Sequence, residues 1–139
     1  MSNRRWMQLL AVALLAWSLV GCVTTKESPA ARLASPLVKL SAAVVAELRD
    51  SPTGPPASDE LLLAAAMQGK PELQRAFAGV PIKVRRDARN AVLLVCSPDG
   101  QTAWLEDASW TPGVDQRWYQ SQPSHPAQFT LDPAQAPLR

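Results

Sequence analysis

The feature that most constrains the fold is an uninterrupted apolar run, AVLLVC, at residues 91–96. The run is short, and turn-forming residues bound it at 87–90 and 97–100, which is typical of a strand buried on both faces. Side chains alternate along a strand, so the two faces carry different residues: Val92, Leu94 and Cys96 on one, Leu93 and Val95 on the other. The helices can cover one face of this strand, and the second face must also be covered or it stays exposed as an apolar patch.

Two further strands are expected beside it. Before the run, the apolar residues Val80, Ile82 and Val84 alternate with the basic residues Lys83 and Arg85. This period of two predicts a half-buried strand. After the run, SPDG at 97–100 places Pro and Gly where a tight turn requires them, and residues 101–106 predict the return strand. We expect a three-stranded antiparallel meander with residues 91–97 at its centre.

Three helices are expected before the strands. The first is predicted to begin at Ser35–Pro36, a cap followed by a proline at the first helical position, and to end near Arg49. Ser58 predicts the cap of a second helix, which is apolar on all sides, and Pro71 predicts the start of a third. One face of the first helix is apolar: Leu37, Leu40, Val44 and Leu48. The expected fold class is α+β, with N-terminal helices packed on the small three-stranded meander.

The C-terminal part is rich in proline. Thr111–Pro112 predicts a short helix, which would include Val114, Arg117 and Trp118. Residues 121–139 carry four prolines and are expected to form a Pro-rich tail, although residues 128–131 are compatible with an added edge strand. We expect Phe129 to Leu131 to cover the second face of the central strand, and a protein partner is the alternative.

The N-terminus has the pattern of a secretory signal peptide. Arg4 and Arg5 precede residues 6–20, an apolar run in which only Gln8 and Ser18 are polar. The run is shorter than the roughly 20 residues that a membrane-spanning helix needs, and small residues follow it, as in a cleaved signal. We therefore expect residues 1–21 to be a signal peptide.

The end of this segment, LVGC at residues 19–22, resembles the lipobox of bacterial lipoproteins. The resemblance covers those four residues and the signal peptide before them. It implies cleavage between Gly21 and Cys22, a diacylglyceryl group on the Cys22 sulfur and acylation of the new amine. An uncleaved anchor, or cleavage after Ser18 by the ordinary peptidase, is the alternative.

The same resemblance implies a location. In this family an Asp directly after the Cys favours retention in the inner membrane, and here that residue is Val23. The resemblance therefore implies an outer-membrane anchor in the bilayer, with inner-membrane retention as the alternative. Residues 22–35 would be the lipidated Cys and a flexible tether, and residues 36–120 a single periplasmic domain.

Removing the signal peptide changes the charge and the cysteine count. The chain has 14 Lys and Arg against 12 Asp and Glu, and without Arg4 and Arg5 the two signs balance. Composition therefore gives no basis for nucleic-acid binding. With Cys22 acylated, Cys96 has no intramolecular disulfide partner, and we expect it to be an inert core residue.

Catalytic chemistry is hard to assemble from these residues. The single histidine, His125, follows Ser124 in the proline-rich tail, where a hydrolase pair would lack a rigid scaffold and an orienting acid. Glu106 and Asp107 are adjacent, so on a strand they point to opposite faces and cannot act together. No spacing of Cys or His fits a metal site, and we expect no cofactor and no enzyme activity.

Two surface features suggest binding. A basic group could meet anionic lipid, a glycan or an acidic partner, although edge strands often carry such charges merely to prevent aggregation: Lys83, Arg85, Arg86 and Arg89. An aromatic group could stack on a glycan or a protein, although core packing is the alternative: Trp104, Trp110, Trp118 and Tyr119. We expect a non-catalytic binding or assembly component with a protein partner in the envelope, using these side chains except Trp104, which is expected in the core. Recognition of cell-wall glycan is the alternative.

Overall fold

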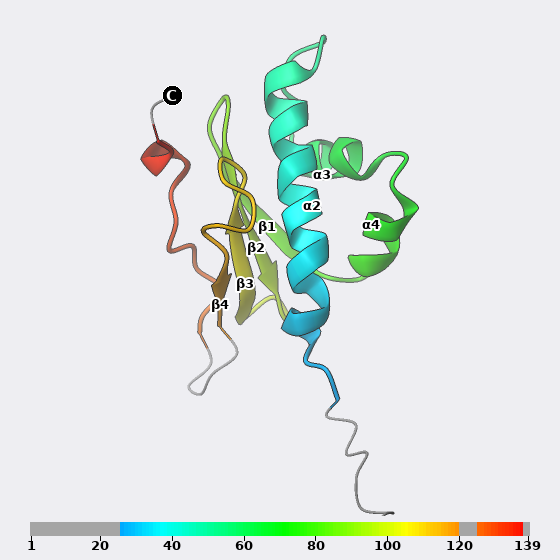
Figure 1. Cartoon of the computed structure of the whole chain (residues 1–139), viewed down its shortest axis with the longest axis vertical. Helices are drawn as coiled ribbons and strands as arrows, with labels where there is room; N and C mark the ends of the chain where they lie inside the picture. Colours follow the sequence, from blue (N-terminus) through cyan, green and yellow to red (C-terminus); the bar gives the residue numbers. More distant parts are fainter. Residues whose placement is uncertain (1–25, 120–124, 138–139) are drawn as a thin grey trace, which may run out of the picture.

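The computed structural model describes residues 26–119 and 125–137 and shows an α+β arrangement (Figure 1). The helices are α2 (Pro29–Asp50), α3 (Asp59–Met67) and α4 (Pro71–Ala76). The strands are β1 (Ile82–Arg86), β2 (Ala91–Cys96), β3 (Ala103–Ala108) and β4 (Arg117–Trp118), and a 3-10 turn, η2 (Pro133–Gln135), follows. The strands form one antiparallel sheet in the order β1-β2-β3-β4. The α+β class is confirmed, and the sheet has one strand more than expected.

The first helix begins earlier than the sequence suggested. The cap of α2 is Ser28, whose hydroxyl accepts a hydrogen bond from the Ala31 N–H at 3.1 Å, and Pro29 is its first residue. The expected tether at 22–35 is therefore wrong from residue 29 onward, and the domain starts earlier than residue 36. Residues 22–25 lie outside the described part of the chain.

The early start has a physical cause. Ser28–Pro29 carries the same cap-and-proline signature as Ser35–Pro36, and starting there buries Ala30 and Leu33 against the rest of the core. Pro36 is accommodated inside the helix, at the cost of one backbone hydrogen bond, because proline has no N–H. The added apolar burial offsets that loss.

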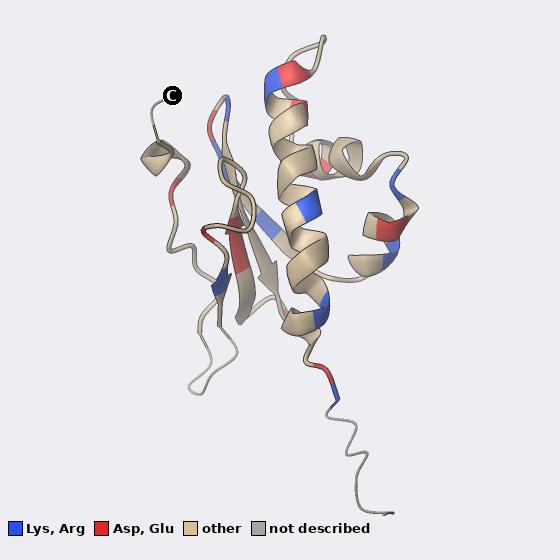
Figure 2. Cartoon of the chain, viewed as in Figure 1, with Lys and Arg blue, Asp and Glu red and all other residues tan. Residues whose placement is uncertain are grey.

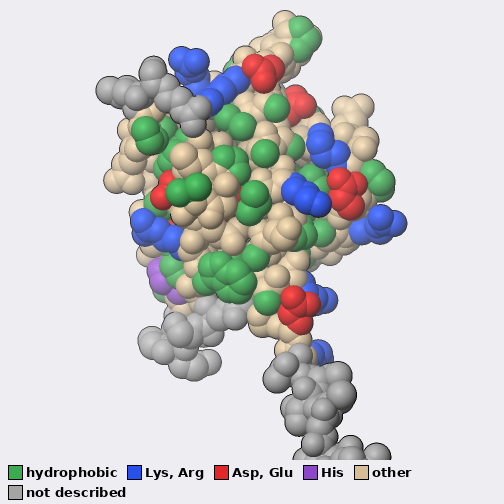
Figure 3. All heavy atoms as spheres, viewed as in Figure 1, with side chains coloured by type: hydrophobic (Ala, Val, Ile, Leu, Met, Phe, Trp, Pro, Cys, Tyr) green, Lys and Arg blue, Asp and Glu red, His purple; other side chains and the backbone are tan. Residues whose placement is uncertain are grey.

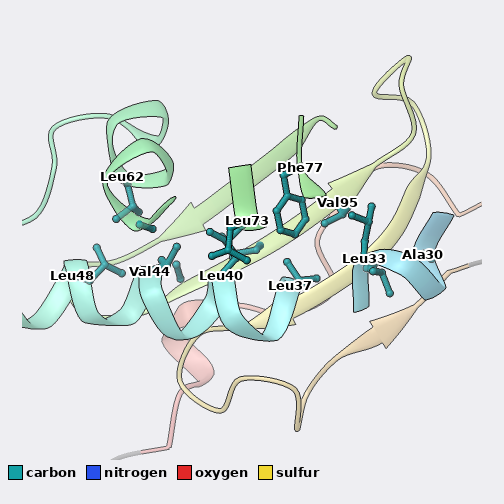
Figure 4. Close-up of a cluster of buried hydrophobic side chains, with 14 residues drawn as sticks. Ala30, Leu33, Leu37, Leu40, Val44, Leu48, Leu62, Leu73, Phe77 and Val95 are labelled. Atoms are coloured by element: carbon teal, nitrogen blue, oxygen red, sulfur yellow. The ribbon is translucent and has the colours of Figure 1, made fainter. Parts of the chain in front are cut away.

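The core lies between α2, the two shorter helices and one face of the sheet (Figure 4). The apolar stripe expected on the first helix is buried as predicted, and Leu62, Leu73 and Phe77 reach the same cluster from α3, α4 and the residue after α4. The sheet contributes Ala91, Leu93, Val95 and Leu105. Burying a side chain of this size stabilises the fold by about 1.5–3 kcal/mol, so this cluster is the main source of stability.

The region expected to form a fourth helix is instead a set of turns and a strand. Residues 111–115 form turns, and β4 pairs with β3 through Leu105 and Glu106. The Asp115 carboxylate accepts hydrogen bonds from the Trp110 ring N–H and the Thr111 hydroxyl. Gly113 has a φ of 80°, which a helix does not allow. The helix prediction is therefore wrong because side-chain hydrogen bonds and a glycine favour a turn.

The second face of the central strand is covered by the tail, as expected. The described tail residues lie on the side of the sheet opposite α2 (Figure 1). Phe129 packs against both clusters on this face, and Leu131 is only 5% exposed beside Val92. The edge strand predicted at 128–131 is wrong, since these residues form no strand. Within the described residues, the tail's pairing with the sheet is one isolated bridge, between Thr102 and Pro126.

Candidate functional site

Two adjacent acidic residues on β3 lie on opposite faces of the sheet, and both are fully buried. Glu106 is opposite Leu94 and faces the tail, whereas Asp107 is opposite Leu93 and faces α2. The expectation that they cannot act together is confirmed. Each therefore has to be explained by its own surroundings, because a buried carboxylate is costly unless hydrogen bonds satisfy it.

Glu106 binds the tail to the sheet through both carboxylate oxygens. Its Oε1 accepts hydrogen bonds from the backbone N–H groups of Thr130 and Leu131, at 2.9 and 2.8 Å. Its Oε2 accepts from the hydroxyls of Tyr119 and Thr130, at 2.5 and 2.6 Å. We call Glu106, Tyr119, Thr130 and Leu131 the tail clasp. Four donors on one buried carboxylate explain how a segment without strand pairing is held in place.

Neighbouring groups complete the tail clasp. The Arg117 guanidinium donates to the Thr130 hydroxyl oxygen at 2.9 Å, so the Thr130 proton remains available for Glu106. Burial raises the pKa of Tyr119, and its hydrogen bond to Glu106 raises it further. Tyr119 therefore keeps its proton and remains a donor at neutral pH.

Asp107 is less well satisfied. Its Oδ1 accepts from the Gly113 N–H at 3.0 Å, and its Oδ2 makes no hydrogen bond of good geometry with any described residue. The buried Ser41 hydroxyl lies near enough to Asp107 to affect its pKa, but within the described residues it makes no hydrogen bond of good geometry. Burial raises the pKa of Asp107, and the nearby Asp115 charge adds to this, while Ser41 and the Gly113 N–H act in the opposite direction. This carboxyl faces the helices and is closed to a ligand.

An open pocket of about 330 Å³ lies at the end of the molecule where α2 ends. We call it the distal pocket. It is bounded by the end of α2, the β1–β2 turn, the start of the 110–115 turn and the tail: Arg49, Asp87, Arg89, Asn90, Trp110, Thr111, Pro133, Ala134, Ala136 and Pro137. Figure 2 shows that the end of α2 and the β1–β2 turn carry both basic and acidic residues, and Figure 3 shows Lys and Arg side chains exposed at that end.

Hydrogen bonds fix the polar side of the distal pocket. The Arg49 guanidinium donates to the Arg89 carbonyl at 3.1 Å and to the Asn90 side-chain oxygen at 2.6 Å. The Asp87 Oδ1 accepts from the backbone N–H groups of Arg89 and Asn90, both at 2.8 Å. The two Arg49 contacts join the turn to the helix end, and the two Asp87 contacts are internal to the turn. The Arg89 guanidinium, in contrast, makes no hydrogen bond or ion pair within the described residues, and Arg89 is exposed.

The predicted basic group is divided by the structure. Lys83 and Arg85 face the tail, where Lys83 donates to the Ala127 carbonyl at 3.4 Å and Arg85 lies over the Phe129 ring at 4.8 Å. Arg86 points to the other face and pairs with Asp59 at 2.9 Å. Only Arg89 reaches the distal pocket. The expectation of one continuous patch is wrong, because alternation along β1 sends neighbouring side chains to opposite faces.

The predicted aromatic group is divided as well. Trp110 is 8% exposed and belongs to the cluster under the tail, and it also lines the distal pocket beside Arg89. Tyr119 is in the tail clasp, and Trp104 packs against the helix-side core. Trp118 is the exception, at 50% exposed. A glycan platform would need several exposed rings on one face, and the described aromatics do not provide one.

The remaining candidates have structural surroundings or lie outside the described residues. The His125 ring stacks on Tyr119, with 4.0 Å between the ring centroids, and its Nδ1 lies 2.7 Å from the Pro126 carbonyl oxygen. Ser124, Gly21 and Cys22 are outside the described residues. Cys96 is buried as expected, and burial raises the pKa of its thiol. Across residues 26–119 and 125–137, no group of three His, Cys, Asp or Glu side chains is placed to hold a metal ion.

Sequence reasoning missed most of the distal pocket. Arg49 was read only as the end of a helix, and Asp87 and Asn90 only as turn residues. The sequence does show an Asp at the start of the turn and an Arg at the helix end, but the contact between the helix end and the turn depends on tertiary packing.

Comparison with known proteins finds no matching family model, no similar curated protein and no similar solved structure. No helix in the described part of the chain is long and apolar enough to span a membrane.

Proposed function

We propose that this protein is an outer-membrane lipoprotein, anchored through acylated Cys22, that acts in the periplasm as a non-catalytic binding or assembly component. Its binding site is the distal pocket. The lipobox-like residues 19–22 support the anchor. The observation that carries the binding role is the position of this pocket at the C-terminal end of α2, the end distant from Pro29. Figure 1 shows α2 as one continuous helix between these two ends.

The length of α2 sets the distance between anchor and pocket. A helix of 22 residues is about 33 Å long at 1.5 Å per residue. α2 begins at Pro29, so few residues separate the lipid-bearing Cys22 from this rigid element. A pocket at the far end of such a spacer is held away from the bilayer, at a high local concentration relative to partners in the same envelope layer.

The anchor is tested by metabolic labelling with a fatty acid. We expect the wild-type chain to be labelled and to fractionate with outer membranes, and Cys22→Ala to lose both properties. Persistent labelling of Cys22→Ala, or fractionation of the wild type with inner membranes, would contradict the anchor or its location.

The pocket is tested by site-specific crosslinking in cells. A photo-reactive amino acid at Ala134, on the pocket wall, is compared with the same group at Ala64, an exposed position on α3. We expect an adduct from Ala134 alone, and its loss in a chain that also carries Arg89→Glu. Equal adducts from both positions, or no adduct from either, would overturn the pocket as the binding site.

A further inference from the structure

We propose that the distal pocket recognises a carboxylate side chain on an extended acidic segment of a protein partner. This rests on the proposed function, because it names the chemistry of the pocket assigned there. The pocket offers one arginine that is already positioned, Arg49, and one that has no partner within the described residues, Arg89. A guanidinium lining a pocket without a counter-ion is a ready donor for an anion.

The arrangement favours a carboxylate over a phosphate. Phosphate sites in proteins commonly use free backbone N–H groups. Here the N–H groups of Arg89 and Asn90, which lie at the pocket, already donate to the Asp87 Oδ1. The Asp87 charge at the same wall also repels a dianion more strongly than a monoanion. The side-chain donors that remain fit the planar two-oxygen geometry of a carboxylate.

The other walls favour a peptide over a small free anion. Four of the lining residues, all from the tail, are apolar: Pro133, Ala134, Ala136 and Pro137. Such a wall contacts carbon atoms, as a peptide backbone and its methylene groups provide. The Asp87 carboxylate can also accept a hydrogen bond from a peptide N–H. A volume of about 330 Å³ accommodates one or two residues of a peptide.

The position of the pocket argues against a lipid headgroup of the anchoring membrane. The pocket lies at the end of α2 that is distant from Pro29, where the helix begins. The separation of about 33 Å expected from the helix length is also several times the roughly 8 Å over which physiological salt screens charges. The anionic surface of that bilayer is therefore a poor match for Arg89.

The test uses the full mature lipidated chain in detergent and fluorescence anisotropy of a labelled, end-capped peptide, Gly-Asp-Gly-Asp-Gly. The matched peptide carries Asn in place of Asp. We expect the Asp peptide to bind at least roughly tenfold more tightly at physiological salt, since charge-assisted hydrogen bonds are about twice as strong as neutral ones. Arg89→Ala should abolish this preference, and Arg75→Ala, at an exposed position on α4, should preserve it.

Three outcomes would overturn the assignment. They are equal binding of the two peptides, equal weakening by Arg75→Ala and Arg89→Ala, and inorganic phosphate displacing the Asp peptide at concentrations that acetate cannot match. If any of these occurs while the Ala134 crosslink in cells persists, the carboxylate assignment alone fails. If the crosslink is absent, the proposed function itself fails.

Discussion

On one face of the sheet lie three helices that fill a continuous apolar cluster, and on the other lies a tail with almost no regular structure. The helix side is stabilised by the burial of apolar side chains, and Leu37, Leu40 and Val44 are fully buried there. The tail side has smaller clusters and depends on the carboxylate of Glu106 for its attachment. The two faces of one sheet are thus stabilised by different physical interactions.

The adjacent carboxyls of β3 show this difference within two residues. Glu106 accepts four hydrogen bonds and fastens the tail, whereas one oxygen of Asp107 makes no hydrogen bond of good geometry within the described part of the chain. A buried polar group stabilises a fold only when its hydrogen bonds are made. The tail clasp is therefore a stabilising device, and Asp107 is a residue that the helix face tolerates. Because Pro133 and Ala134 line the distal pocket, tail attachment also shapes the binding site.

The largest expected effect comes from the helix face. Leu40→Ala removes a fully buried side chain from the centre of the main cluster and should lower the free energy of unfolding by about 3 kcal/mol. Urea denaturation followed by circular dichroism measures it. Both faces should unfold in one transition, because the tail has no core of its own. If the tail stayed docked on the sheet after the helices had unfolded, the helix face would not be the main source of stability.

The next effect comes from the tail clasp. Glu106→Ala leaves the N–H groups of Thr130 and Leu131 and the Tyr119 hydroxyl without their acceptor, and should lower the free energy of unfolding by about 2 kcal/mol. The tail should also become sensitive to limited proteolysis while the helices remain resistant. Glu106→Gln is the matched control, since its amide oxygen can still accept from both N–H groups. The same sensitivity in both variants would contradict a hydrogen-bonded clasp.

A smaller effect of opposite sign is expected at Asp107. Burial raises the pKa of Asp107 in the folded state above its value in the unfolded chain. The folded state is therefore destabilised when Asp107 ionises, and the free energy of unfolding falls as the pH rises from the unfolded-state pKa to the folded-state pKa. Asp107→Asn should raise the free energy of unfolding by up to about 1 kcal/mol at pH 7, since its amide can donate to Ser41. The gain should disappear at pH 3. A destabilised Asp107→Asn at pH 7 would show that the ionised carboxyl is needed.

The smallest effect is expected at Trp118, on the edge strand β4. Its side chain is half exposed, and surface substitutions of this kind change stability by less than about 0.5 kcal/mol. In the same urea titration, the small change in the free energy of unfolding of Trp118→Ala is the reference for the larger changes expected from Leu40→Ala and Glu106→Ala. A loss comparable with that of Glu106→Ala would mean that β4 contributes more to the fold than its exposure suggests.

The local parts of the fold were predictable from sequence. Residues 91–96 form the central strand, and Ser58 caps α3 with its hydroxyl 3.2 Å from the Leu61 N–H. Such features depend on periodicity and on residues within one turn of each other. The start of α2 was missed because two Ser–Pro pairs carry the same signal, and only tertiary burial of Ala30 and Leu33 distinguishes them.

The candidate site was much less predictable. The distal pocket joins Arg49 to residues 87–90 and to the tail, segments that no local pattern connects. Glu106 illustrates the same limit, because its partners Thr130 and Leu131 lie 24 and 25 residues further along the chain. The sequence showed that Glu106 and Asp107 face opposite ways, but the docked tail determines which of them is satisfied.

The attachment of the tail through Glu106 is tested most directly by hydrogen exchange at two backbone amides. The N–H groups of Thr130 and Leu131 both donate to the buried Glu106 carboxylate. We predict that in the wild-type chain they exchange at least roughly a hundredfold more slowly than in an unstructured peptide, and that Glu106→Ala removes the protection while β2 stays protected. Exchange of both amides at unstructured rates in the wild type would contradict the account.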